Sequence, residues 1–109
     1  MSLVSSTYLT HNDNLYFSKD ELSKILNIYS KGVSRGKWKD YAIYFSNNNA
    51  SFYIFKHSLA SPEYILEKTF ERKRKIIFYL LKSNNIIKKF ENLDSLIFFL
   101  TRKIFKILN

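Results

Sequence analysis

The fold is decided by residues 40–57, which read DYAIYFSNNNASFYIFKH. Residues 40–46 and 51–57 are rich in aromatic and β-branched side chains and follow a period of two, which is typical of β-strands. They flank three asparagines at 47–49, and asparagine tolerates the positive φ angles that tight hairpin turns need. The stretch therefore predicts a β-hairpin.

The register of this hairpin depends on its loop. If Asn48 and Asn49 form the loop, like side chains face each other on both faces, which favours that register over its neighbours. The expected pairs are Phe45 with Phe52, Ile43 with Ile54, and Tyr44 with Tyr53. The tyrosine pair is similar to the exposed aromatics of sheets that bind single-stranded nucleic acid, and the alternative is that it lines the core under a helix.

Upstream of the hairpin, an amphipathic helix is predicted over residues 19 to about 33, because apolar residues recur there at helical spacing. Ser18 and Glu21 form a capping box, in which each side chain accepts a bond from a backbone N–H that the helix leaves unpaired. Gly32 and Gly36 are the two glycines of the chain. They bracket the end of the helix and mark a turn.

Downstream of the hairpin, strands are predicted over 64–70, 75–82 and 86–90, and Asn92 is expected to cap a last helix. The apolar residues of strand 75–82 lie on both of its faces. The whole order predicts an α+β domain with an N-terminal helix, a four- or five-stranded antiparallel meander sheet and a C-terminal helix. Both helices are expected to pack on one face of the sheet.

The domain organisation is expected to be simple, with a flexible N-terminal tail over residues 1–15 and a single α+β domain over 16–109. The chain has no cysteine, which excludes disulfides, thiolate zinc sites and cysteine nucleophiles. We expect no signal peptide, because residues 1–10 have no basic segment followed by an apolar stretch. We expect no transmembrane segment, because the most apolar stretch, 93–108, is interrupted by three basic residues. These features fit a cytoplasmic protein.

The formal net charge is +9, and residues 55–109 contribute +7 of it. A basic surface releases counterions when it meets phosphate, so this charge is one argument for nucleic-acid binding. A second explanation is codon usage. Lys, Asn, Ile, Phe and Tyr, which have AT-rich codons, make up half of the chain. Both explanations stay open at this stage.

A resemblance to a known family covers about half of the chain, and its most distinctive part is the string Trp38-Lys39-Asp40-Tyr41-Ala42. The residues that carry it are Glu21-Leu22, Ile25 to Tyr29, Gly36 to Ile43, Phe52, Ile54-Phe55-Lys56, Pro62, Tyr64 and Glu67-Lys68. Over residues 17–68 the chain resembles a bacterial family catalogued as domain of unknown function 2794. The resemblance implies one compact cytoplasmic bacterial domain and brings no known activity.

One candidate loop site lies between the first helix and the sheet. It comprises Arg35, Lys37, Trp38, Lys39 and Asp40. An aromatic ring flanked by cations can stack on a base and hold phosphate. We favour a structural role instead, because the one tryptophan of a small domain usually packs in its core.

A second candidate site is a basic stripe on neighbouring strands that contacts a polyanion. Its residues are Arg72, Lys73, Arg74, Lys75, Lys88 and Lys89. Such a stripe would bind backbone phosphates without reading base sequence. The competing explanation is that lysines on edge strands prevent edge-to-edge pairing.

A third candidate is a partner or dimer surface on the last helix, formed by Phe98, Phe99 and Phe105. These side chains fall outside the main apolar face of that helix and leave apolar surface for a homodimer or for an unknown protein partner. Basic residues beside them are also typical of membrane-surface helices. We rank peripheral membrane contact third, because the main apolar face is needed for the domain's own core.

Enzymatic chemistry is not expected. Two histidines, His11 and His57, lie far from any acidic cluster, and Glu67 and Glu71 stand beside basic residues as expected of salt-bridge partners. We therefore predict no catalytic residues, no metal and no cofactor. The predicted function is a non-catalytic protein-interaction or self-associating module, and the alternative is an RNA- or DNA-binding domain that uses the basic second half.

Overall fold

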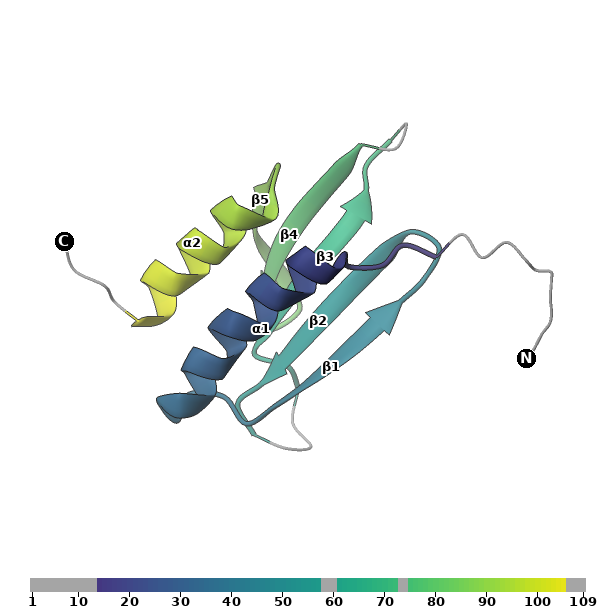
Figure 1. Ribbon diagram of the computed structural model, residues 1–109. Coiled ribbons are helices and arrows are strands. Elements are labelled where there is room, and N and C mark those ends of the chain that lie inside the picture. The colour runs from purple at the N-terminus through teal and green to yellow at the C-terminus, as the bar shows by residue number, and fades with distance from the viewer. Residues whose placement is uncertain (1–13, 58–60, 73–74, 106–109) are drawn as a thin grey trace, which may run out of the picture.

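The computed structural model describes residues 14–57, 61–72 and 75–105. Its described residues form two helices and five strands (Figure 1). In chain order these are α1 (Lys19–Ser34), β1 (Asp40–Phe45), β2 (Asn49–Phe55), β3 (Tyr64–Phe70), β4 (Ile76–Lys82), β5 (Asn85–Phe90) and α2 (Leu93–Phe105).

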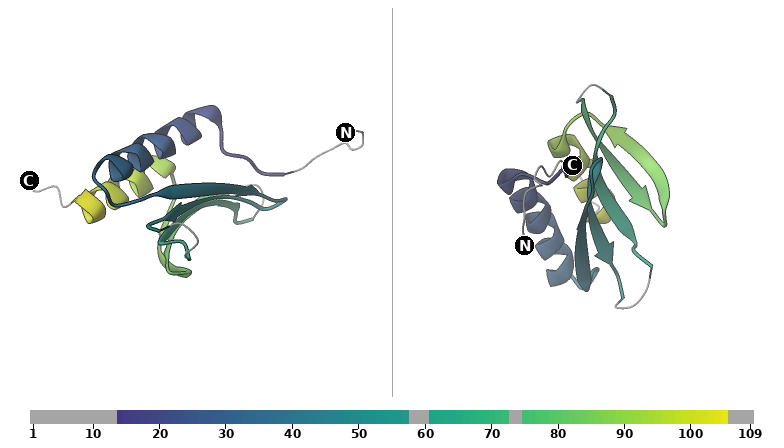
Figure 2. Two further views of the ribbon diagram at one scale, coloured as in Figure 1. Left: turned by 90° about the horizontal axis from the view of Figure 1, so that it is seen from below. Right: turned by 90° about the vertical axis from the view of Figure 1, so that its right-hand side faces the viewer.

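The five strands form one antiparallel sheet in which every strand pairs with its neighbours in the chain. Both helices lie on the same face of this sheet, as the left view of Figure 2 shows. The predicted α+β meander with two helices on one face is therefore confirmed, with five strands rather than four.

The predicted register of the first hairpin is wrong by two residues. The observed pairs are Ile43 with Phe52, Tyr44 with Ser51 and Phe45 with Ala50. Because side chains alternate with a period of two, a shift of two leaves each residue on the face that was expected. Tyr44 and Tyr53 still touch, now as diagonal neighbours whose ring centroids are 4.9 Å apart.

The shift has its cause in the third strand. The carbonyl oxygen of Asn48 accepts bonds from the backbone N–H of Phe70 at 3.2 Å and from the hydroxyl of Thr69 at 3.0 Å. Pairing with β3 therefore holds Asn48 and extends β2 to Asn49. The loop closes one position earlier, where the N–H of Ser46 donates to the carbonyl oxygen of Asn49 at 2.8 Å.

The second hairpin, whose register the sequence left open, turns at Ser83 and Asn84. Both residues have positive φ, at 53° and 68°, as the two central residues of a type I′ turn do. Lys82 consequently pairs with Asn85. A register irregularity beside Leu80 then shifts the pairing along β5.

The ends of α1 follow from local sequence. The N–H of Ser18 donates to Glu21 at 2.8 Å and the N–H of Glu21 donates to Ser18 Oγ at 3.0 Å, which confirms the capping box. At the other end Gly36 has φ +72°, and the N–H of Lys37 donates to the carbonyl oxygen of Gly32 at 2.8 Å. These bonds form a Schellman motif that ends the helix.

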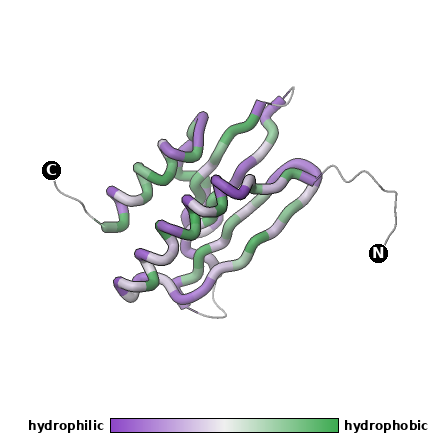
Figure 3. The backbone as a smooth tube through the Cα atoms, viewed as in Figure 1, coloured by the Kyte–Doolittle hydropathy of each residue, from purple (hydrophilic) through white to green (hydrophobic). Residues whose placement is uncertain are grey.

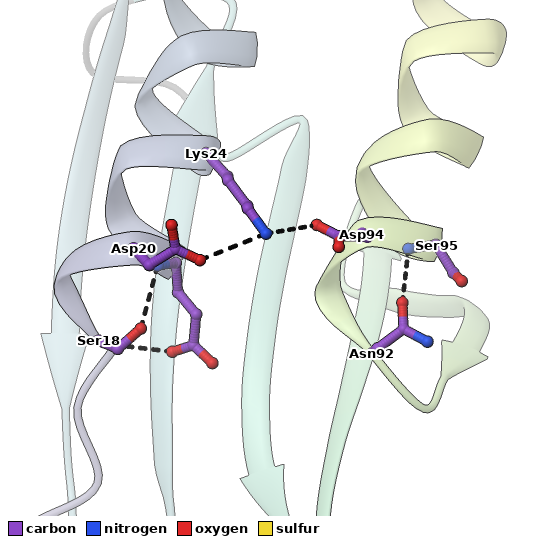
Figure 4. A network of polar contacts seen from close by, with 7 residues as sticks. Ser18, Asp20, Lys24, Asn92, Asp94 and Ser95 are labelled. Carbon is purple, nitrogen blue, oxygen red and sulfur yellow. Dashed lines mark hydrogen bonds and ion pairs between the residues drawn. The ribbon is translucent and has the colours of Figure 1, made fainter.

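The start of α2 is capped as predicted, because Asn92 Oδ1 accepts a bond from the N–H of Ser95 at 2.8 Å. Beside this cap, Lys24 of α1 lies between Asp20 and Asp94 and joins the two helices (Figure 4). More of α2 than of α1 is hydrophobic (Figure 3). None of the helices in the described ranges is long and apolar enough to cross a membrane.

The main core lies between the helices and the sheet. Its fully buried members on the sheet include Phe52, Ile54 and Leu66, and α1 and α2 contribute Ile25 and Leu96. The face of the sheet that points away from both helices is called the open face below.

Candidate functional site

The open face carries a row of apolar side chains across all five strands. Successive pairings place Ala42, Tyr53, Ile65, Leu81 and Ile86 next to one another in that order. The solvated face of an antiparallel sheet usually carries polar residues. This row is apolar from one edge of the sheet to the other.

The neighbouring row on the open face is mixed. It runs through Tyr44, Ser51, Glu67, Tyr79 and Lys89. Two tyrosines, one carboxylate and one ammonium group thus lie beside the apolar row. The tyrosine pair considered in the sequence analysis is on the open face and not under a helix, with Tyr44 56% exposed.

Part of the open face forms a second apolar layer without a helix over it. Ile65 and Ile77 are 5% and 0% exposed although both point away from the main core. Around them Phe55, Tyr79 and Leu81 are half-buried. Ile86, on the edge strand, is 62% exposed. The apolar side chains of the open face therefore have a closely packed centre and an exposed margin.

The charged residues of the open face differ in their surroundings. Burial raises the pKa of Glu67, and no cation is among the causes of its shift. Glu71 accepts a bond from Lys89 Nζ at 2.8 Å, across the intervening strand β4, and this bond lowers the pKa of Glu71. Glu67 thus forms no salt bridge with the described residues and is a partly buried carboxylate.

We expect Glu67→Gln to stabilise the domain at pH 7 and to leave its stability unchanged in acid. Because the pKa of Glu67 is higher in the folded than in the unfolded chain, stability is lost as pH rises from the ordinary value, about 4.3, through the raised one. The glutamine variant has no such loss. Thermal unfolding midpoints at pH 7 and at pH 3.5 measure the difference.

Glu71→Gln is the matched control, and its expected effect on stability at pH 7 has the opposite sign. The pKa of Glu71 is lowered in the folded state, so the contribution of this carboxylate to stability is present at neutral pH and lost on acidification. The variant should therefore be slightly less stable than wild type at pH 7. A Glu67→Gln variant that is destabilised at pH 7 would contradict the assignment of Glu67 to an apolar environment.

The structure places the tryptophan of the predicted loop site inside the core. Trp38 is 2% exposed, its Nε1–H donates to Glu63 at 3.2 Å, and its ring stacks on Tyr29. The ring is therefore unavailable for stacking on a base. Asp40 Oδ1 accepts a bond from the N–H of Tyr41 at 2.8 Å.

Besides the buried Trp38, two members of the same loop site line a pocket. Arg35 and Lys37 lie there with Lys56, Lys82 and Lys103. Lys39 and Asp40 do not line it. We call the five lining cations and the space between them the basic pocket.

The structure brings part of the predicted basic stripe together, because Arg72, Lys75 and Lys89 all lie near Glu71, whose pKa they lower. Lys88 pairs with Leu80 on the helix-covered face, where its Nζ lies 5.0 Å from the centre of the Phe99 ring. Lys89 points to the open face and is bonded to Glu71. Arg72 and Lys75 are exposed at the β3–β4 connection, and Lys73 and Arg74 lie outside the described residues.

The predicted partner surface on α2 is smaller than the sequence indicated. Phe98 is 64% exposed. Phe99 packs against Phe90, with ring centroids 5.6 Å apart, and Phe105 lies beside the ring of Trp38 at 6.4 Å. Phe99 and Phe105 therefore belong to the margin of the core.

Sequence reasoning missed most of the open face. Besides the tyrosine pair, its aromatic and aliphatic members are Ala42, Phe55, Ile65, Ile77, Tyr79, Leu81 and Ile86. One sequence signal could have revealed this face. Strand 76–82 has apolar residues on both of its faces, which indicates apolar side chains on both faces of the sheet. In the described ranges, no group of three or more His, Cys, Asp or Glu residues could hold a metal ion.

Comparison with known proteins gives one family. The model of a family described as "Protein of unknown function (DUF2794)" matches residues 15–97. The match confirms the resemblance noted over 17–68 and extends it through the later strands into α2. No curated protein and no solved structure matches the chain.

Proposed function

Since the chain belongs to the DUF2794 family of proteins of unknown function, we propose its function from its own surface: it is a self-associating module. In this proposal the open face of one copy packs against the open face of a second copy. The module is non-catalytic. The dimer that it forms has four layers, with the two sheets inside and the helices outside.

The observation that supports this proposal is the apolar row across all five strands. Among the described elements no helix lies over it, because α1 and α2 both pack on the other face. Two sheets that pack face to face bury such rows against each other. Burial of apolar surface is the dominant favourable contribution to most protein association.

A second copy can pack on the open face because the two rows of that face carry no excess of positive charge. The apolar row has no charge, and the mixed row has one carboxylate, Glu67, and one ammonium group, Lys89. Two chains of net charge +9 can therefore meet on this face without bringing like charges together. A two-fold axis makes such a contact self-complementary.

Nucleic-acid binding is the second candidate, and the exposed tyrosines are its best support. Bases stack on such rings, but the phosphates beside them need cations. On the two rows of the open face the one lysine, Lys89, is already bonded to Glu71. Glu67 would repel a phosphate. The charge of this face therefore favours protein over nucleic acid.

We expect light scattering to give twice the chain mass of 13.0 kDa for the wild type and the monomer mass for Ile86→Glu. A carboxylate buried without a partner is strongly unfavourable, so dissociation should become about 100-fold easier or more. Phe98→Glu is the matched control, since Phe98 is 64% exposed and Ile86 62%. This variant also replaces an exposed apolar side chain by a carboxylate, but on α2, and it should leave the mass of the dimer unchanged.

Other outcomes would assign the surfaces differently. A wild-type monomer at high protein concentration would refute self-association. Dissociation by Phe98→Glu but not by Ile86→Glu would move the interface to α2. If the wild type bound single-stranded RNA tightly and Tyr44→Ala abolished this binding, the open face would be a nucleic-acid-binding surface.

A further inference from the structure

The basic pocket lies at the end of the domain where both helices finish. α1 and α2 run in the same direction over the sheet, so their C-terminal ends lie side by side (Figure 1). The pocket between these ends and the sheet has a volume of about 470 Å³. This size is within the range of small-molecule sites.

Cations reach this pocket from separate parts of the chain. Arg35 and Lys37 come from the turn after α1, Lys56 follows β2, Lys82 ends β4, and Lys103 stands in the last turn of α2. Residues so distant in sequence meet there only through the fold. Like charges brought together repel one another, so this arrangement is unfavourable unless an anion accompanies it.

None of these five cations takes part in the four ion pairs found among the described residues. Cations at helix C-termini also balance the helix dipole, and that explanation covers Arg35 and Lys103. It does not cover Lys56, which follows β2, or Lys82, which ends β4.

The acidic side chain that lines the basic pocket is Glu63. Its Oε1 accepts the bond from Trp38 Nε1 at 3.2 Å. The pocket thus keeps a net charge of +4 from its lining side chains. Its aromatic members, Trp38 and Tyr64, are 2% and 1% exposed, so the lining has no open ring on which a base could stack.

We propose that the basic pocket binds a small anion that carries more than one phosphoryl group. Arginine and lysine are the side chains that bind phosphate oxygens best. The net charge matches a di- or triphosphate group, and the volume exceeds the need of a single phosphate. This inference does not depend on the open face or on self-association.

Calorimetric titration of the full chain with inorganic pyrophosphate at low ionic strength tests the proposal. We expect saturable binding that the combined change of Lys56→Ala and Lys82→Ala weakens by about tenfold or more. The matched control combines Lys19→Ala with Lys75→Ala, which removes the same charge from exposed positions at the other end of the domain. It should change the dissociation constant less than about twofold.

Two further variants keep the test independent of folding. Lys103→Glu changes an exposed residue of α2 and should also weaken binding by about tenfold. Glu63→Gln removes the carboxylate that lines the pocket but keeps an acceptor for Trp38, so it should tighten binding several-fold.

Three results would overturn the proposal. The first is no saturable binding of pyrophosphate by the wild type. The second is equal weakening in the pocket pair and the control pair, which would indicate attraction by overall charge. The third is tighter binding of single-stranded RNA than of pyrophosphate with equal sensitivity to both pairs, which would indicate nucleic-acid binding over a wide surface.

Discussion

Replacing Gly32 by alanine should destabilise the domain strongly, although alanine is the better helix former by about 1 kcal/mol. A Cβ atom at position 32 would lie 2.6 Å from Cδ2 of Trp38 and closer still to its Cε3. The ring would have to leave its place. Losing the packing of a large aromatic side chain costs about 3–5 kcal/mol, so the net loss should be about 2–4 kcal/mol.

The ring of Trp38 has little room to move away from a new methyl group. It stacks on Tyr29 at 6.3 Å and meets Tyr64 edge-on at 6.3 Å, and Phe105 lies at 6.4 Å on another side. Its Nε1–H is bonded to Glu63. Because packed interiors do not adapt freely to added volume, the strain should reach several aromatic neighbours.

Denaturant unfolding followed by the fluorescence of Trp38 measures this effect. Gly36→Ala is the control. A Cβ atom at Gly36 would meet no atom within 4 Å, and placing alanine at its positive φ should cost about 1–2 kcal/mol. The double variant Gly32→Ala, Trp38→Leu should lose less free energy of unfolding than the sum of the losses of the two single variants. A Gly32→Ala variant as stable as the wild type, with unchanged fluorescence, would contradict the close contact.

The elements of the fold were predictable where their signals are local. The capping box at Ser18 and the cap at Asn92 depend on bonds that span three residues, so the helix starts follow from sequence. The strands follow from a period of two. The register of the first hairpin did not, because its loop is set by bonds from Thr69 and Phe70 of the third strand.

The candidate sites were less predictable, because they depend on which faces remain uncovered. Adjacent residues in a strand point to opposite faces, and this rule alone separates Lys88 from Lys89. By contrast, no local rule joins Arg35 to Lys56, Lys82 and Lys103. The basic pocket exists only after α1, the sheet and α2 have packed together.

The second large effect concerns a buried ion pair that joins the central strand to the start of α1. Lys68 Nζ lies 2.8 Å from Glu21 Oε1 and 2.8 Å from the carbonyl oxygen of Tyr16. The two side chains are 11% and 22% exposed. Glu21 also accepts the N–H of Ser18, so the same carboxylate caps the helix and neutralises the lysine.

We expect Glu21→Gln to lower the free energy of unfolding by about 3 kcal/mol, because it leaves the ammonium group of Lys68 buried without a counter-charge. Glutamine keeps an acceptor for Ser18, so the loss should not come from the cap. Lys68→Met should lose a similar amount by leaving the carboxylate of Glu21 unpaired. Denaturant unfolding at pH 7 measures both variants.

The double variant separates the ion pair from other effects of the substitutions. With both charges removed, neither is left buried and unpaired, so the double variant should be more stable than the sum of the single losses predicts, by about 1–3 kcal/mol. Lys24→Met is the control, since Lys24 contacts Asp20 and Asp94 at the exposed surface (Figure 4), where such pairs contribute little. If Lys68→Met were as mild as Lys24→Met, the pair would not be the buried link between β3 and α1 that its exposure and distances indicate.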